Sequence, residues 1–548
     1  MTARRRLLFA CALAAGLLYV EAGALGALSA PDEVRVAGIG VEMVARGAWA
    51  IPTLGGEPFL EKPPLGFLSV GFATRLFGRT ALAARLPSML WGLVAALSLA
   101  ALARRVYGRL SAGLGAGALL LLSPSVLKYS HRCLVDGSLL GAVTLSALCL
   151  WRFVDTPSRR GRWALAAVGA CALAFFAKGA VGLVFPSLFL VGLLAVRRDA
   201  KLLRSPWFWL SPGAVIALVG LWLAGVAAEG GEAALKTVVV DNHLRRFAPA
   251  AGYAGGHERP WHYYLGKLPV VLLPSLVLLP AALAWHRRQG RTRQPLGPCL
   301  AWLGGGAVLL SLAGTKRQVY LLPLVPPAAL LAGGWVAGLI GRPLTRLEDW
   351  TLRALGWAAL AGALVGPGVL LGRGAPLRCA LVCGWAAGAA VALFAFLALR
   401  RGRVEGFLLR VLLALLLTLL GCYPSYAAMQ DRRHDLSAFF RGVAVRVPPR
   451  VPILLWEPSE ATRGALRFYA DRSGRTIARL AEAREATGAR ALVVVERVRR
   501  GRPVRVAAAE ALGARVLLRA RSEREAALLV AWGAWAGARG SSPARRSP

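Results

Sequence analysis

Apolar stretches of about 20 residues recur along most of this 548-residue chain, and they constrain its fold more than any other feature. A helix of about 20 residues crosses the hydrocarbon core of a bilayer, and its backbone polar groups are satisfied within the helix itself. Hydrophobic residues make up 57% of the sequence, above the 45–50% or so that is usual for soluble domains. We therefore predict a polytopic α-helical membrane protein.

Thirteen apolar segments before residue 428 are predicted to be transmembrane helices. They lie at roughly 7–29, 83–103, 110–127, 137–153, 163–177, 180–196, 208–227, 263–285, 298–314, 318–340, 352–372, 377–399 and 408–427. The turn after every second segment is rich in arginine, at about 104–109, 152–162, 197–204, 287–293, 342–353 and 400–403. Because short cytoplasmic loops are enriched in Lys and Arg, these turns and the basic N-terminus are predicted to be cytoplasmic. The chain after the thirteenth helix is then external.

Carboxylates and histidines gather in the loops on the external side. The main external loops are about 30–82 and 228–262, and four of the six histidines lie in external loops. Within the first loop, 34–47 has the pattern of a short amphipathic helix and 62–78 that of a second, apolar helix, and both are predicted to lie in the interface plane. This distribution predicts a reaction site on the external face.

The tail after residue 427 is less hydrophobic. The sequence predicts a transmembrane domain over 1–427 and an external α/β domain over 428–548. The predicted elements of the tail are strands at 451–457 and 491–498 and helices at 459–470, 476–487 and 505–512. Its last dozen residues are expected to be disordered. Neither a Gly-x-Gly-x-x-Gly pattern nor a P-loop is present, and no convergent polar motif stands out, so neither a nucleotide site nor catalytic groups are expected in the tail.

The formal net charge of +40 could suggest nucleic-acid binding. We exclude that class because the basic residues come as short clusters between apolar segments. The eight cysteines are scattered, and no Cys-x-x-Cys pair occurs. This pattern is typical of small buried apolar residues, and it favours neither a disulfide framework nor a zinc site.

Adjacent charges in the external loops admit two interpretations from side-chain chemistry alone. Asp32 and Glu33 follow the first helix, either as the acidic first turn of another helix or as a catalytic base at the membrane surface. Glu61 and Lys62 form either a local ion pair or a site in which the lysine binds a lipid phosphate while the glutamate orients it or binds metal. Asp136, which opens the fourth helix, is either a helix cap or a functional carboxylate.

Basic and aromatic residues near later helix ends are equally open. Lys316 and Arg317 lie on the external side, where they either snorkel to the interface or bind an anionic phosphate. Tyr320 begins the next helix. His257 stands in the glycine-rich and aromatic end of the loop 228–262, either as a surface histidine or as a ligand.

Taken together, these motifs resemble the first periplasmic loop of the lipid A aminoarabinose transferase family. That family belongs with the protein O-mannosyltransferases among the GT-C membrane glycosyltransferases, which use polyprenyl-phosphate sugars. The matching positions are Asp32, Glu33, Arg35, Gly47, Trp49, Pro52, Glu61, Lys62, Pro63 and Pro64. Further landmarks are ARLPS at 84–88, the pair Lys178–Gly179, HERPWHYY at 257–264 and KRQVYLLPLVPP at 316–327. The resemblance covers roughly residues 28–340.

The resemblance implies roles for individual residues. Asp32, Lys62 and Asp136 would be catalytic, as the essential aspartate, the lysine that contacts phosphate and the second-loop aspartate. Substrate-binding roles fall to Glu33, Arg35, Lys316, Arg317 and Tyr320. Glu61 and His257 resemble a pair implicated in binding a divalent metal, which would be zinc, magnesium or manganese.

The implied activity is transfer of a sugar from an undecaprenyl phosphate donor to lipid A, lipopolysaccharide or a protein. It would occur on the periplasmic face of a bacterial inner membrane, among membrane lipids and without a nucleotide or nucleic acid. Glycosylation of the protein O-mannosyltransferase type is the alternative within this class. A lipid flippase or transporter is the alternative from another class, but it would show half-chain repeats and mid-membrane charges, and the sequence shows neither.

Overall fold

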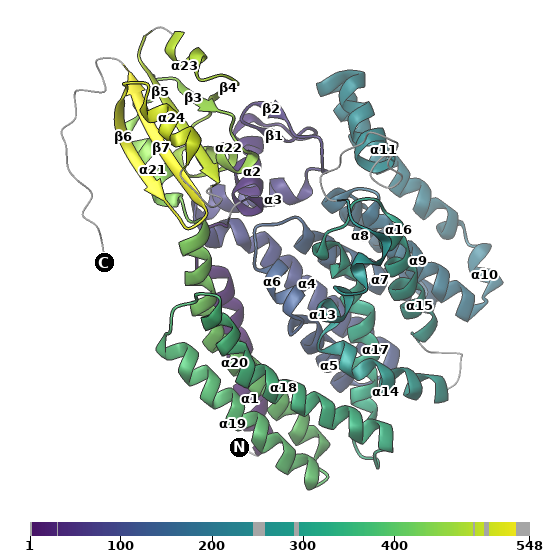
Figure 1. Cartoon of the computed structure of the whole chain (residues 1–548). Coiled ribbons are helices and arrows are strands. Elements are labelled where there is room, and N and C mark those ends of the chain that lie inside the picture. Colours follow the sequence, from purple (N-terminus) through teal and green to yellow (C-terminus); the bar gives the residue numbers. More distant parts are fainter. Residues whose placement is uncertain are drawn as a thin grey trace.

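The computed structural model of this chain describes residues 3–29, 31–244, 258–289, 295–485, 488–497 and 503–532. Figure 1 shows a long helical bundle with a small β-sheet at one end. Nine helical segments in the described part of the chain pass the length and hydropathy requirements for a membrane span. They contain α1 (Ala3–Ala24), α4 (Ala81–Tyr107), α7 (Asp136–Asp155), α8 (Arg160–Lys178), α11 (Pro206–Lys236), α17 (Val325–Gly338, together with the turn before it), α18 (Arg346–Gly372), α19 (Cys379–Arg400) and α20 (Val404–His434). A multi-span helical protein is therefore confirmed.

The described residues hold nine such helices, or eleven if each of two bent pairs is one span. In the first pair, α5 (Leu110–Leu121) turns by 68° into α6 (Pro124–Ser130). In the second, residues 261–272, which include α13 (Leu268–Leu272), turn by 89° into α14 (Ser275–Arg288). Proline has no N–H to continue a helix, and it stands at both breaks, as Pro124 and Pro274.

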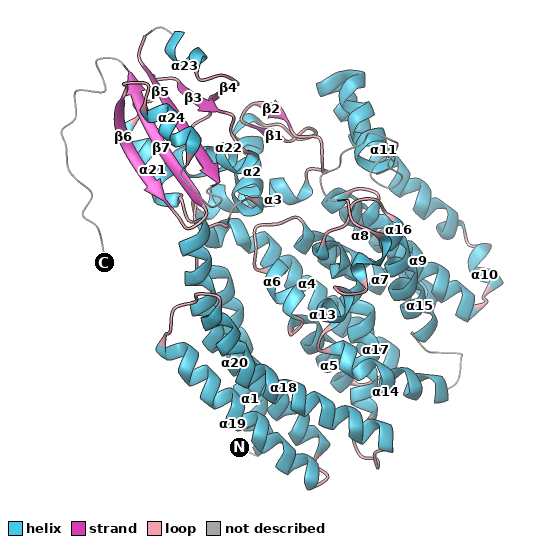
Figure 2. Cartoon of the chain, in the orientation of Figure 1, coloured by secondary structure: helices cyan, strands magenta, loops and turns pink. Residues whose placement is uncertain are grey.

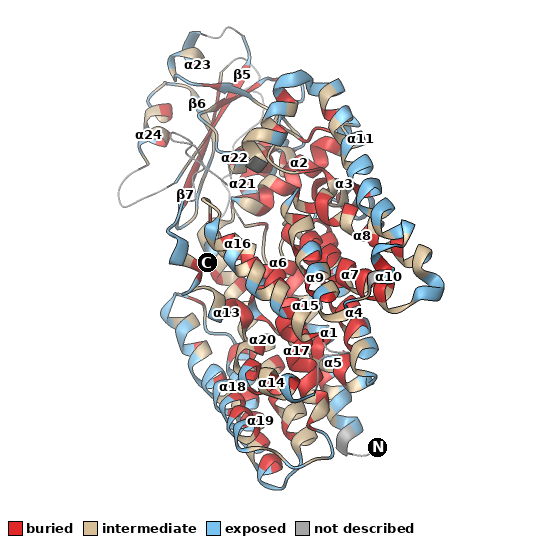
Figure 3. Ribbon diagram, turned by 90° about the vertical axis from the view of Figure 1, so that its right-hand side faces the viewer, coloured by how far each residue is buried: buried red, intermediate tan, exposed pale blue. Residues whose placement is uncertain are grey.

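Shorter helices occupy the two remaining predicted spans. These are α9 (Val181–Arg197) and the run α15 (Leu296–Leu300), η4 (Ala301–Gly305) and α16 (Gly306–Leu312). The 3₁₀ segment η5 (Gln318–Leu324) leads into α17, and the short α10 (Ala200–Leu203) leads into α11. Figure 3 shows α11 mostly exposed at the edge of the bundle, whereas α7 and α17 are largely buried within it.

The first external loop forms the two predicted helices, α2 (Asp32–Arg46) and α3 (Leu65–Phe77). They are joined by a hairpin of β1 (Thr53–Leu54) and β2 (Glu57–Pro58). The helices cross where Gly40 meets Gly71, since a Cβ added to Gly71 would lie 2.2 Å from the Gly40 carbonyl oxygen. Residues 36–43 of α2 are all buried between other elements. That both helices lie in the interface plane stays a prediction.

The sheet lies in the C-terminal part of the chain, as Figure 2 shows. Its strand order is β4-β3-β5-β7-β6, with β4, β3 and β5 parallel and β7 and β6 antiparallel to their neighbours. The strands are β3 (Ile453–Trp456), β4 (Arg475–Ile477), β5 (Arg490–Arg497), β6 (Arg515–Arg521) and β7 (Glu525–Trp532). The helices of this α/β unit (437–532) are α21 (Ser437–Arg446), α22 (Glu460–Ala470), α23 (Ala481–Glu485) and α24 (Val504–Glu510).

The tail prediction was incomplete. Residues 476–477, predicted as the start of a helix, belong to the strand β4, and the helix begins only at α23. Strands β6 and β7 were not predicted, because β7 is rich in alanine and leucine, and alanine is depleted in strands. The expected disordered end lies outside the described residues.

The α/β unit shares a hydrophobic core with the first external loop. One buried cluster contains Val36 and Phe67 from that loop together with Phe440, Leu466 and Val493 from the unit. Helix α22 also lies directly on α2, because a Cβ added to Gly464 would stand 2.5 Å from the carbonyl oxygen of Val34. The tail therefore packs on the helix that begins at Asp32.

Candidate functional site

Asp32 is the first residue of α2, and its carboxylate is held by two arginines. One oxygen accepts a hydrogen bond from Arg35 at 2.9 Å, and the other accepts one from Arg317 at 2.7 Å. Burial would raise the pKa of this carboxyl, but Arg317, Arg35 and Lys62 hold the pKa below its ordinary value. Asp32 is thus an ionised carboxylate at neutral pH, with its orientation fixed from two sides.

Arg35 connects this carboxylate to the α/β unit. Its second guanidinium nitrogen donates to Glu460 of α22 at 2.5 Å, and the guanidinium stands 5.7 Å from the ring centroid of Phe59. Glu460 thus brings a polar side chain of the tail to the first external loop. This contact could not be predicted from sequence, since the two residues are 425 positions apart.

Lys62 lies in the same electrostatic environment, just before α3. Burial lowers the pKa of its ammonium, and the neighbouring cations Arg35 and Lys178 lower it further, while Asp136 and Glu61 act in the opposite direction. The resulting pKa is about 8. Lys62 is therefore mostly charged at neutral pH, and its charge is easily lost as the pH rises.

Asp136 begins α7 and forms an ion pair with Lys178, the last residue of α8. The Lys178 ammonium also stands 4.3 Å from the ring centroid of Tyr320 on η5. The predicted residues Asp136 and Tyr320 are thus linked by a lysine that the sequence showed only as a family landmark. A stronger signal was available, because a lysine at a helix end predicted to be external runs against the usual placement of basic residues.

These contacts define one group of side chains, here called the Asp32–Lys62 cluster. Its members are Asp32, Arg35, Lys62, Asp136, Lys178, Arg317 and Tyr320. Four cations face the two carboxylates of the cluster, while Glu460 pairs with Arg35 and Glu61 acts on Lys62 at its edge. Arginine and lysine in this arrangement suit a phosphate group, and α2, α7, α8 and η5 all end or begin here.

Glu33 does not belong to this cluster, and its contacts favour a structural role over the predicted substrate-binding one. Its side chain is 1% exposed and accepts hydrogen bonds from Arg85 at 2.9 and 3.1 Å. The backbone N–H groups of Ser29 and Cys133 also donate to it. Burial would raise the pKa of Glu33, but Arg85 holds it below its ordinary value. Both oxygens of Glu33 are engaged inside the protein, and we assign this residue a structural role.

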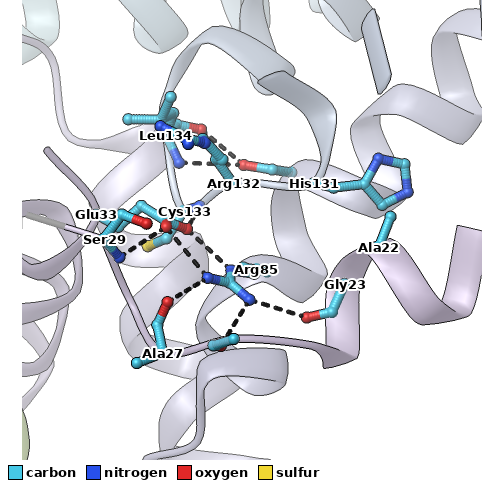
Figure 4. A network of polar contacts seen from close by, with 12 residues as sticks. Ala22, Gly23, Ala27, Ser29, Glu33, Arg85, His131, Arg132, Cys133 and Leu134 are labelled. Atoms are coloured by element: carbon cyan, nitrogen blue, oxygen red, sulfur yellow. Dashed lines mark hydrogen bonds and ion pairs between the residues drawn. The ribbon is translucent and has the colours of Figure 1, made fainter. Parts of the chain in front are cut away.

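Arg85 uses its remaining donors to fix the chain between α1 and α2. It donates to the backbone carbonyls of Gly23, Leu25, Gly26 and Ala27. Figure 4 shows the guanidinium between Glu33 and this turn. The arginine therefore sets where α2 begins, and it positions Asp32 indirectly.

Lys316 also takes a different place from the predicted one. It is 4% exposed, and its ammonium donates to the backbone carbonyls of Arg259 and Ala313. These bonds fasten residue 259 to the loop before η5. We assign Lys316 this structural role, and of the predicted pair only Arg317 reaches Asp32.

The predicted metal pair is not brought together by the described residues. Glu61 is half-buried beside Lys62, whereas His257 lies outside the described residues. Across the described part of the chain, no group of three or more His, Cys, Asp or Glu side chains could hold a metal ion. A divalent metal at Glu61 and His257 stays a prediction, and no step below depends on it.

Both the sequence and the fold of this chain resemble those of known proteins. A family model described as dolichyl-phosphate-mannose-protein mannosyltransferase matches residues 61–223. An undecaprenyl phosphate-alpha-4-amino-4-deoxy-L-arabinose arabinosyl transferase from Pectobacterium carotovorum is 30% identical over 400 residues, which is 70% of this chain and 69% of that protein. The protein of the same name from Pseudomonas paraeruginosa is 30% identical over 64% of this chain and 63% of its own length.

The fold matches a solved membrane protein over nearly the whole chain. The crystal structure of ArnT from Cupriavidus metallidurans bound to undecaprenyl phosphate has a TM-score of 0.77 and 21% sequence identity, covering 96% of this chain and 98% of that one. Its apo form matches with a TM-score of 0.76. This match includes the C-terminal α/β unit as well as the helical bundle.

Proposed function

This chain belongs to the family of the undecaprenyl phosphate-alpha-4-amino-4-deoxy-L-arabinose arabinosyl transferases, and from that premise we propose that it is a GT-C glycosyltransferase. It transfers a sugar from a polyprenyl-phosphate donor to an acceptor at the membrane surface. The observation that carries the proposal is the Asp32–Lys62 cluster, in which three cations, Arg35, Lys62 and Arg317, lie around the oriented Asp32 carboxylate.

The donor phosphate is the leaving group of this reaction. Its bond to the anomeric carbon breaks, the electron pair goes to the phosphate oxygen, and an acceptor oxygen forms the new bond to the sugar. Lys62, Arg35 and Arg317 offer positive charge where negative charge develops on the departing phosphate. Preorganised charge of this kind contributes roughly 3–4 kcal/mol per group removed.

The surroundings of Asp32 bear on the choice of acceptor. A carboxylate whose pKa is held low by two arginines is a weak base. It removes the proton of a neutral hydroxyl less readily than an ordinary aspartate would. A lipid phosphate is already anionic and brings no such proton, so we favour a phosphate acceptor on lipid A. Asp32 then stabilises the positive charge that develops on the sugar ring.

A protein hydroxyl acceptor is the second candidate, because the family model that matches residues 61–223 describes protein mannosyltransferases. Mass spectrometry of envelope lipids and glycoproteins from cells with and without the gene separates the two. Loss of a sugar from lipid A supports the first candidate, and loss from a protein supports the second.

We also propose thirteen spans, with the cluster and the α/β unit in the periplasm. This count takes each bent pair as one span and adds α9 and the run from α15 to α16. The basic turns at 104–109 and 342–353 lie at the ends of their helices that face away from the cluster. Reporter fusions after about residues 205, 290 and 403 should be cytoplasmic, and fusions after about 50, 245 and 440 should be external. A cytoplasmic tail would refute this topology.

The site itself is tested with Asp32→Asn and Lys62→Ala in the purified full chain. Both variants should insert normally and lose about 100-fold or more in transfer rate, since one preorganised group is worth about 10²–10³ in kcat. Lys62→Ala should also weaken binding of undecaprenyl phosphate, whereas Asp32→Asn should bind it nearly as before. Lys201→Ala, an exposed lysine on α10, is the matched control and should be unchanged. Near-normal turnover in both test variants would remove this site.

A further inference from the structure

A large opening lies at the end of the bundle opposite the Asp32–Lys62 cluster (Figure 1). It has a volume of about 1090 Å³. Its lining comes from the beginning of α1, the turn after α17, the last half of α19, the turn at 401–403 and the first half of α20. Figure 1 shows these segments at the N-terminal end of the bundle, far from the sheet. We call this opening the α19–α20 cleft.

The walls of the α19–α20 cleft are apolar, while its polar lining is mostly arginine. Leu339, Val391, Phe394, Leu397 and Leu409 are among the apolar wall residues. The charged lining residues are Arg342, Arg401, Arg403, Arg410 and Glu405. The lining thus holds four cations and one carboxylate next to apolar walls. It forms an amphipathic, positively charged surface.

The arginines differ in how far they are already engaged. Arg342 is fixed by an ion pair with Glu348 and by the carbonyl of Gly338. By contrast, Arg401 and Arg403 are exposed, and among the described residues neither makes a side-chain hydrogen bond or an ion pair. Two guanidinium groups are therefore available at the mouth of the cleft.

The N-terminus of α20 adds to this positive charge. Arg403 is the residue before the 31-residue helix, and no side chain caps it. The first N–H groups of a helix and its macrodipole favour an anion at that end. The available guanidinium groups and the helix end thus act at the same place.

We propose that the α19–α20 cleft binds one anionic phospholipid of the membrane. Its acyl chains lie against the apolar walls, and its phosphate is held by Arg401 and Arg403. An apolar cleft at the depth of the bilayer is filled by hydrocarbon in preference to water, and basic pockets between transmembrane helices bind anionic headgroups. The planar fork of arginine pairs with two oxygens of a phosphate.

The expected effect of such a lipid is to hold α1, α17, α19 and α20 together. A ligand that binds only the folded state stabilises it by RT ln(1 + L/Kd), where L is the free lipid concentration, so the gain rises with that concentration. The cleft does not touch the Asp32–Lys62 cluster, so this lipid differs from the donor and does not depend on the proposed transfer reaction.

The test uses native mass spectrometry and thermal denaturation of the purified full chain with phosphatidylglycerol or phosphatidylcholine. Wild type should retain phosphatidylglycerol in preference and gain a higher melting temperature from it. The double variant Arg401→Ala/Arg403→Ala should bind it at least tenfold more weakly, with phosphatidylcholine unaffected. Arg401→Lys/Arg403→Lys should recover part of the binding, because the charge is kept.

The matched control is Arg287→Ala/Arg288→Ala, which removes two exposed arginines from α14 that do not line the cleft. It should retain phosphatidylglycerol as wild type does. Equal loss in the control and the test variant would overturn the proposal, because surface charge alone would then explain retention. Absence of any preference for the anionic lipid would also overturn it. So would displacement by undecaprenyl phosphate from the same arginines, which would assign the cleft to the donor lipid.

Discussion

Replacing Glu33 by glutamine separates a structural role from a substrate-binding role for this residue. The variant keeps the size of the side chain but removes its charge. Arg85 would then remain buried, with its side chain 5% exposed, and without a counter-ion. One of the two oxygens would also become an NH₂ group facing the donors of Arg85 and Ser29. We therefore expect the variant to be strongly destabilised.

The size of the effect follows from the burial of the pair. Removing one partner of a buried ion pair costs about 3–5 kcal/mol. Asp155 provides the matched comparison, because it pairs with Arg105 and Arg197 at 2.9 and 3.0 Å with side chains that are 22–43% exposed. An exposed pair of this kind is worth about 0–1 kcal/mol. Asp155→Asn should thus melt close to wild type, and Glu33→Gln well below it.

The assay is thermal denaturation of both purified variants in one detergent, together with binding of undecaprenyl phosphate below the melting temperature. The fraction of Glu33→Gln that remains folded should still bind this lipid, because its phosphate contacts belong to other residues. The opposite result would refute the reasoning. If Glu33→Gln melts like Asp155→Asn but loses the lipid, then Glu33 is a substrate ligand, as the sequence had predicted.

Three further outcomes are expected. The kcat/KM for the donor should fall as the pH rises, with a midpoint near pH 8, because the Lys62 ammonium has a pKa of about 8 and loses its charge above that pH. In Lys62→Arg this alkaline decrease in kcat/KM should move to higher pH. A decrease that does not move would belong to another group. Glu460→Gln should lower kcat several-fold with little change in melting temperature, since it weakens the half-exposed ion pair that holds Arg35. An unchanged kcat would show that Glu460 does not position Arg35. Gly464→Ala should lower both stability and transfer rate, because its Cβ would lie 2.5 Å from the backbone of α2. The control Gly213→Ala on α11 should be neutral, because its Cβ meets nothing within 4 Å. Equal behaviour of the two variants would contradict the packing of α22 on α2.

The hydrophobic segments alone predicted a helical membrane protein, because the length of an apolar segment is read directly from the sequence. They could not show that 110–127 and 263–285 are bent, or that β6 and β7 complete a sheet. Those features depend on packing partners. The α/β unit lies on α2 through side chains and glycines more than 350 residues further along the chain.

For the site, the sequence placed Asp32 and Lys62 in one external loop, and both belong to the cluster. It could not tell which acidic neighbour faces the cluster. Successive residues on a helix point about 100° apart, so Asp32 and Glu33 face different partners. Helix α2 is covered on more than one side, by α3 and by α22, and its hydrophobic pattern therefore gives no single inward face. Only the tertiary structure, by placing Arg85 behind Glu33 and Arg317 beside Asp32, decided the role of each carboxylate.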